Sequence, residues 1–218
     1  LFAFKFLEKS NVLNSILLGA TSGISMAIRL PGAYIPLFVL LLALLRLKSR
    51  IKFLLTSLFV TSLTFYVCSP ILWSDPINNL LLAYETMARF PQKTLTLYFG
   101  QQVSSLAVPW HYVLGWILVT TPLTYLVSFG IGVVSLAKVR SSKFVFVLLW
   151  FLVPIFTASI LRPNLYDSYR HLFFVYPALL IIAVVGIDTL FRHNQILVKY
   201  LLIIFVAIDM LSTLFFMV

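Results

Sequence analysis

The stretch "FVFVLLWFLVPIFTASIL", residues 144–161, contains no charged side chain and lies between Lys143 and Arg162. A run of this length and apolarity is typical of a helix that crosses a lipid bilayer, because a helix pairs its backbone polar groups within the segment. Comparable runs recur along the chain, in which 61% of residues are hydrophobic and 10% are charged. A water-soluble globule would need polar helix faces that this sequence lacks. The sequence therefore predicts an all-α, polytopic transmembrane bundle that forms one domain over residues 1–218.

Seven apolar segments are candidates for membrane spans. They cover residues 12–28, 31–46, 52–69, 110–136, 144–161, 170–190 and 196–218. Pro122 lies inside the fourth segment and should kink that helix, because proline lacks a backbone donor. Gly19 and Gly23 are four positions apart in the first segment, a spacing that lets a second helix approach closely.

The basic residues set the orientation of these spans. Most fall on alternate connections, and lysine and arginine beside spans are retained on the cytoplasmic side. These residues are Lys5, Lys9, Arg46, Lys48, Arg50, Lys52, Lys138, Arg140, Lys143, Arg192 and Lys199. The same topology puts Arg29, Arg162 and Arg170 on the outer side. The formal net charge of +10 then reflects topology and contact with anionic membrane lipid, and nucleic acid is excluded as a partner.

The long connection at residues 70–109 faces outward in this topology and carries a helix of its own. Ser74, Asp75 and Pro76 form a helix start, with a capping side chain before a proline at the first helical position. Apolar residues from Ile77 to Met87 then recur at helical spacing. This amphipathic helix is too short to span, so we expect it along the outer membrane surface, as a brace or as a wall that steers a lipid-linked substrate.

Scarce polar residues gather in "RPNLYDSYRHLFFVYP", residues 162–177, on the predicted outer side. They are Arg162, Tyr166, Asp167, Tyr169, Arg170 and His171. The two arginines and the histidine suit an anion at the membrane surface, because arginine makes paired, charge-assisted bonds to phosphate oxygens. A structural alternative stays open, in which Asp167 caps the next helix or pairs with Arg170 or His171, and the tyrosines lie at the interface.

A second polar and aromatic group lies in "YFGQQVSSLAVPWHYVLGW", residues 98–116, where the fourth span leaves the outer face. His111 can donate a hydrogen bond to an anion, and Gln101 is a supporting candidate. Trp110 fits the aromatic belt of a membrane interface. Arg29, at the end of the first span, either reaches the interface or binds an anionic headgroup.

Several of these segments resemble one family. "NLYDSYRHLFFVYPAL" resembles the Y-D-x-x-R-H-x-x-F-x-x-P segment of bacterial family 39 glycosyltransferases, relatives of the dolichyl-phosphate-mannose protein mannosyltransferases. "SPILWSDP", "YFGQ" and "PWHYVLGWILVTTPL" occur in the order and spacing of that family, and "GATSGISMAIRLPG" is similar to its mid-chain glycine helix. The resemblance covers essentially the whole chain.

The resemblance implies a GT-C fold in a multi-pass protein of the cell membrane, in bacteria the inner membrane. Such an enzyme transfers a sugar from a polyprenyl- or dolichyl-phosphate donor to a protein, lipid or glycan hydroxyl on the extracytoplasmic side, and no cofactor is identified. Chemically, the leaving lipid phosphate needs positive charge or hydrogen-bond donors. Arg170, His171, Arg162 and His111 fit this requirement.

The acceptor hydroxyl also needs a carboxylate base, and the catalytic residues stay unknown. In the family the acidic residues lie in the loop after the first transmembrane helix, and no segment here matches that loop. The acidic residues present are Glu8, Asp75, Glu85, Asp167, Asp188 and Asp209. None is a convincing base, so we expect the chain to be the carboxy-terminal part of a longer protein that supplies one. No metal-ligand spacing occurs, because the three histidines are scattered.

Two alternatives stay open at this stage. A transporter or flippase would use a buried acid, for which Asp209 in the last span is the candidate. A noncatalytic membrane subunit would explain the absence of a base.

Overall fold

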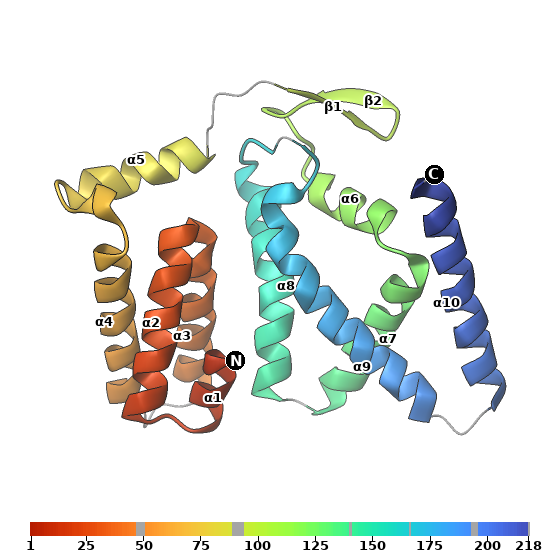
Figure 1. The fold of residues 1–218 in the computed structure, drawn as a ribbon, viewed down its shortest axis with the longest axis horizontal. Helices are drawn as coiled ribbons and strands as arrows, with labels where there is room; N and C mark the ends of the chain where they lie inside the picture. The colour runs from red at the N-terminus through yellow and green to blue at the C-terminus, as the bar shows by residue number, and fades with distance from the viewer. Residues whose placement is uncertain (47–50, 89–93, 140, 166, 193–195, 218) are drawn as a thin grey trace. The chain divides into compact units, whose positions relative to one another are not determined.

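The computed structural model describes residues 1–46, 51–88, 94–139, 141–165, 167–192 and 196–217. Helices dominate these residues (Figure 1), as the all-α prediction requires. The chain divides into two compact units, Leu1–Gln92 and Lys93–Val218, and each is described by itself.

Helices packed through small residues form most of the first unit. Its elements are α1 (Phe2–Glu8), α2 (Val12–Ile28), the 3₁₀ turn η1 (Leu30–Ala33), α3 (Tyr34–Arg46) and α4 (Ile51–Val67). A β-carbon on Gly19 would lie 2.7 Å from the carbonyl oxygen of Ser57, and one on Gly23 would lie 2.7 Å from that of Thr61. The predicted close approach at the two glycines is therefore confirmed, and the helix they admit is α4.

The amphipathic helix of the long connection is α5 (Pro76–Ala88), preceded by the 3₁₀ turn η3 (Pro70–Leu72). Asp75 caps it as predicted: its carboxylate accepts the backbone N–H of Asn78 at 3.2 Å and the side-chain amide of Asn78 at 2.6 Å. Ile77, Leu81 and Tyr84 are each more than half exposed. The helix thus carries apolar side chains that are exposed among the described residues of this unit, and its contact with a membrane stays a prediction.

We expect Asp75→Ala to loosen the first turn of α5, whereas Asp75→Asn should keep most of the cap because asparagine caps about as well. The hydrogen bonds from Asn78 lower the pKa of Asp75 below its ordinary value of 3.8. Ionised Asp75 therefore stabilises the helix above that value, and the contribution is lost as the pH falls through the lowered pKa of the folded state. Amide hydrogen exchange of residues 77–80 is the measurement. Equal exchange in the wild type and Asp75→Ala would contradict the expectation.

The second unit begins with a hairpin that our sequence analysis did not predict. Strands β1 (Leu95–Tyr98) and β2 (Gln101–Ser104) pair antiparallel, with Tyr98 opposite Gln101. Phe99 and Gly100 connect them with φ angles of +47° and +80°. Both angles are left-handed, as in the type I′ turns that close two-residue hairpins.

The fourth predicted span is two helices rather than one kinked helix. The chain bends by 114° between α6 (Tyr112–Thr120) and α7 (Leu123–Val139). Thr121 is extended, with φ −93° and ψ 127°. Proline disfavours the helical conformation in the residue before it, so Pro122 breaks the helix through Thr121 instead of only bending it.

An acidic side chain from the last helix caps the second half of this broken pair. Asp209 lies on α10 (Ile196–Met217). Its carboxylate accepts the backbone N–H of Thr124 at 2.8 Å and also the Thr124 hydroxyl. Thr124 is in the first turn of α7, where backbone N–H groups have no partner within the helix. Asp209 therefore satisfies a helix end that the break at Pro122 creates.

The core of the second unit forms where α9 (Tyr176–Arg192) packs on α7 and on α8 (Ser142–Leu161). Ile182 and Ala183 of α9 are fully buried. A β-carbon on Gly132 would overlap the carbonyl oxygen of Ile182, and one on Gly186 would overlap that of Ser128. Glycine at both positions thus lets the backbones of α7 and α9 touch.

All seven predicted spans coincide with helical residues, but seven crossings are not confirmed. Within the described residues, Ser142–Leu161 and Arg170–Arg192 are each long and apolar enough to cross a membrane, and Tyr112–Thr120 with Leu123–Val139 adds a third if the bent pair crosses as one span. Val12–Ile28, Leu30–Ala43 and Ile51–Val67 are apolar but shorter. About 20 residues are needed to cross the hydrocarbon core without thinning it.

Candidate functional site

An open pocket of about 430 Å³ lies at the end of the second unit that carries the hairpin. It is lined by Tyr98, Phe99, Gln101, Val103, Ala107, Val108, Pro109, His111 and Arg162. Three of these, Gln101, His111 and Arg162, are residues that the sequence analysis assigned to an anion site. The structure brings them together from β2, from the start of α6 and from the end of α8.

Tyr98 holds the imidazole of His111. Its hydroxyl oxygen lies 2.9 Å from Nδ1 of His111 and 3.1 Å from the carbonyl oxygen of the same residue. One hydroxyl carries one proton, so both contacts are hydrogen bonds when Nδ1 donates to the tyrosine and the tyrosine donates to the carbonyl. This arrangement fixes the ring of His111. With Nδ1 donating to Tyr98, Nε2 donates to an anion only when both ring nitrogens carry protons.

The hydroxyl of Tyr98 stays protonated at neutral pH. Burial, and then the neighbouring Tyr112, raise the pKa of Tyr98 above 10.0, its ordinary value. Tyr98 is 7% exposed and packs against the rings of Phe99, Tyr112 and Trp116. Gly115 makes room for it, since a β-carbon there would overlap the Tyr98 hydroxyl. The hairpin is thereby locked onto α6 beside the pocket.

Arg162 lies at the pocket in a backbone conformation that costs energy. It ends α8 with φ 44° and ψ 56°, the left-handed region, and its N–H bonds to the carbonyl of Ala158 at 2.9 Å. Glycine is the usual residue at such a helix end, and other residues pay about 1 kcal/mol or more there. The next loop is tied to the hairpin, because the N–H of Leu165 donates to the carbonyl of Ser105 at 3.3 Å. Strained residues cluster at ligand sites, so this backbone conformation makes Arg162 a candidate functional residue.

The remaining residues of the 162–177 cluster lie elsewhere. Arg170 makes an exposed ion pair with Asp167 at 2.8 Å, one of the alternatives left open by the sequence. Asp167 does not cap the following helix: both it and Ser168 are left-handed, and the 3₁₀ helix η4 (Arg170–Val175) begins after Tyr169 without a side-chain cap. The prediction of a cap at Asp167 is therefore wrong.

The other supporting candidates are placed as follows. Tyr169 is buried, and its hydroxyl lies 2.9 Å from that of Thr120 at the end of α6. His171 is half-buried in η4, and Tyr166 lies outside the described residues. Trp110 is exposed and meets His111 edge to face. Arg29 is exposed at the end of α2, in the first unit.

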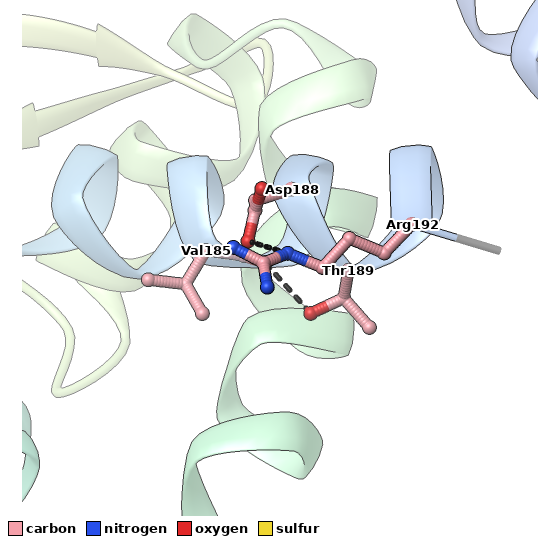
Figure 2. Close-up of polar contacts among 4 residues, drawn as sticks. All are labelled: Val185, Asp188, Thr189 and Arg192. Carbon is pink, nitrogen blue, oxygen red and sulfur yellow. Dashed lines mark hydrogen bonds and ion pairs between the residues drawn. The ribbon is translucent and has the colours of Figure 1, made fainter.

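The partners of four acidic residues are seen in the described part of the chain. Asp75 caps α5, Asp167 pairs with Arg170, and Asp209 caps α7. Asp188 pairs with Arg192 at 2.7 Å, one turn along α9 (Figure 2), where the Thr189 hydroxyl also bonds to the carbonyl of Val185 at 2.8 Å. None of the four lines the pocket. The prediction that a base comes from outside this chain is not tested by these contacts.

Sequence reasoning missed the residues that shape the pocket. Tyr98 and Phe99 were not singled out, and the role of Gly115 depends on a contact with Tyr98 that no local pattern reveals. The alternation in "TLTLY" before "FG" was the available signal for the hairpin, since period-two alternation before a glycine favours a strand and a turn.

We expect Gly115→Ala to lower the unfolding temperature, because the added methyl group overlaps a buried tyrosine and overpacking costs about 1–3 kcal/mol. Tyr98→Phe removes the hydroxyl and should relieve part of the overlap. The double variant Gly115→Ala/Tyr98→Phe should therefore be less destabilised than the sum of the single variants. Thermal unfolding of the four proteins measures this coupling, and strict additivity would contradict the packing.

The described residues form a mostly helical structure. Two of its helices, or three if the bent pair is one span, are able to cross a membrane, and a pocket with polar and apolar walls lies beside the loop that follows α8. Comparison of the chain with protein families, with curated proteins and with solved structures gave no match.

Proposed function

We propose that this chain is part of a membrane glycosyltransferase that takes a sugar from a polyprenyl-phosphate donor, and that the pocket beside the hairpin binds the phosphate of that donor. The observation that carries the proposal is the meeting of Arg162, His111 and Gln101 at one pocket from three separate elements. The family resemblance of the segments that supply Gln101 and His111 is a second support.

The chemistry of the pocket fits a lipid phosphate. A guanidinium group forms charge-assisted hydrogen bonds to phosphate oxygens, and an amide and an imidazole in its protonated form add donors. The pocket wall also has apolar residues, among them Val108 and Pro109, which suit the first carbons of a lipid chain. Among the described residues, no acidic side chain lines the pocket to repel an anion.

The same groups would assist transfer. The bond between the sugar's anomeric carbon and the phosphate oxygen breaks as the acceptor oxygen bonds to that carbon, and the acceptor proton goes to a base. The electron pair of the broken bond stays on the phosphate, so negative charge develops there. Arg162 and His111 would stabilise that charge in the transition state more than in the ground state, which is the condition for catalysis. The acceptor base would come from outside residues 1–218.

Binding and transfer by the full-length protein in lipid vesicles test the proposal. We expect polyprenyl phosphate to compete with a labelled polyprenyl-phosphate hexose, and polyprenol of the same chain length to compete poorly. Transfer of the labelled hexose to an acceptor would establish the activity. Equal competition by the alcohol and the phosphate would refute the phosphate site, and solute uptake without glycosyl product would favour a transporter.

The contacts of Asp209 bear on the transporter alternative. An acid alone in an apolar helix suggests an ion or proton site. Here the carboxylate binds the backbone and side chain of Thr124, so a structural role accounts for its presence. No observation on the pocket or the helices favours transport over glycosyl transfer.

A further inference from the structure

The hairpin β1–β2 presents apolar side chains that are exposed among the described residues of the second unit. Residues opposite each other in an antiparallel pair share a face of the ribbon, so Leu95 and Leu97 share a face with Ser104 and Gln102. Leu95 is 68% exposed and Leu97 is 65% exposed. On the opposite face, Tyr98, Gln101 and Val103 line the pocket. The ribbon is therefore a wall with the pocket on one side and exposed leucines on the other.

The exposed patch continues beyond the strands and is uncharged. Phe99 at the turn is 68% exposed, and Leu106 and Trp110 beyond β2 are 46% and 58% exposed. No charged residue occurs between Thr94 and Tyr112. Proteins exposed to water protect a hairpin edge with charges, since a bare apolar strand invites aggregation. A surface of this kind needs a cover.

The position of the hairpin indicates what the cover is. α8 and the segment Arg170–Arg192 are both able to cross a membrane, and the short loop between them marks one membrane face. The N–H of Leu165 in that loop donates to the carbonyl of Ser105, just after β2. Figure 1 shows the hairpin at the same end of the second unit as this loop. The hairpin is thus held at the level where the two spans leave the bilayer.

We propose that the β1–β2 hairpin lies in the headgroup region of the bilayer, with Leu95, Leu97 and Phe99 among the upper acyl carbons. A two-stranded sheet leaves backbone groups at its outer edges, which hydrocarbon cannot satisfy. The ribbon therefore stays at the interface, where Trp110 is also favoured. On the outward face, β2 carries the polar side chains of Gln102 and Ser104, whereas β1 carries Leu95 and Leu97. We therefore expect β1 to lie deeper in the bilayer than β2. The pocket behind the ribbon then opens at headgroup height.

Site-directed spin labelling of the full-length protein in phospholipid vesicles tests this inference. Single cysteines replace Leu97, Ile160 or Lys138, with Cys68 and any other cysteine changed to serine. Oxygen concentrates in the acyl region, whereas a polar nickel chelate stays in water, so the ratio of their collision rates reports depth. Ile160, 76% exposed near the end of α8, is the lipid reference, and the exposed Lys138 at the end of α7 is the water reference.

We expect the label at Leu97→Cys to give an oxygen-to-nickel ratio close to that at Ile160→Cys and several-fold above that at Lys138→Cys. A ratio equal to the water reference would overturn the proposal. Low collision rates with both reagents would also overturn it, since they would mean that a protein surface covers the hairpin. The inference requires that α8 and α9 cross the membrane, and it does not require glycosyl transfer. The position of the hairpin and the binding of phosphate can therefore be confirmed or refuted independently.

Discussion

Replacing Arg162 by glycine should weaken binding of polyprenyl phosphate about 10- to 100-fold and leave the protein equally or more stable. The loss follows from charge-assisted hydrogen bonds of about 1.5–3 kcal/mol, at 1.4 kcal/mol for each tenfold change in affinity. The stability follows from the backbone, because φ 44° is strained for arginine and unstrained for glycine. A residue whose removal costs binding but not stability is a functional residue. Competition binding and thermal unfolding of the same preparations measure the two effects.

Two matched variants sharpen this prediction. Arg162→Lys keeps the charge but loses the paired geometry, so we expect an intermediate loss of affinity. Arg170→Ala removes an arginine that is already engaged with Asp167 at the surface, and its effect should be the smallest of the three. A larger loss in Arg170→Ala than in Arg162→Gly would show that the phosphate site is not this pocket.

The contrast between these arginines shows where sequence reasoning on the site stops. The sequence analysis grouped three residues that are close in the chain, Arg162, Arg170 and His171. Of these, only Arg162 lines the pocket. The other polar residues there, His111 and Gln101, come from the segment before α6. Left-handed backbone at Asp167 and Ser168 turns the loop between Arg162 and Arg170. Aspartate is tolerated in the left-handed region, but it is also a common helix cap. Its presence in the sequence therefore does not tell which of the two conformations Asp167 adopts.

The helices were predictable because apolar runs with polar ends specify them locally. The predicted segment 12–28 coincides with α2, and Asp75 and Pro76 identify the start of α5. The hairpin was missed because Phe99 occupies a left-handed position that usually takes asparagine, aspartate or glycine. The break before α7 was underestimated in two ways: Pro122 was expected only to bend the helix, and Asp209, which caps the new helix end, comes from a distant helix. Contacts between remote segments decide such features, and a single sequence does not display them.

Contacts between remote segments also explain why some glycines at helix contacts were predicted from the sequence and others were not. Gly19 and Gly23 were recognised from their spacing, whereas Gly132 and Gly186 were not singled out. Ser128 and Gly132 have the small-xxx-small spacing as well, and this signal was available in the sequence. Gly186 has no such partner in its own helix, because the residues it approaches are on α7.

Gly186→Ala and Gly132→Ala should each destabilise the protein by about 1–3 kcal/mol, the usual cost of overfilling a packed interior. The added methyl group would overlap a backbone carbonyl oxygen, Ser128 for Gly186 and Ile182 for Gly132. A carbonyl in a helix cannot rotate away as a side chain can, so α7 and α9 must separate along their contact. The pocket is carried by neighbouring elements of this unit, so we expect ligand binding to weaken with stability.

Gly130→Ala is the control for both variants. Gly130 is two residues from Gly132 on α7, is exposed, and has no atom within 4 Å of the position of an added β-carbon. Alanine is favoured over glycine in a helix by about 0.8–1.0 kcal/mol, so this variant should be neutral or stabilised. Thermal unfolding in one detergent should therefore rank Gly130→Ala at or above the wild type, and Gly132→Ala and Gly186→Ala clearly below it. Equal unfolding temperatures for the Gly130 and Gly132 variants would mean that α7 and α9 do not touch through their backbones.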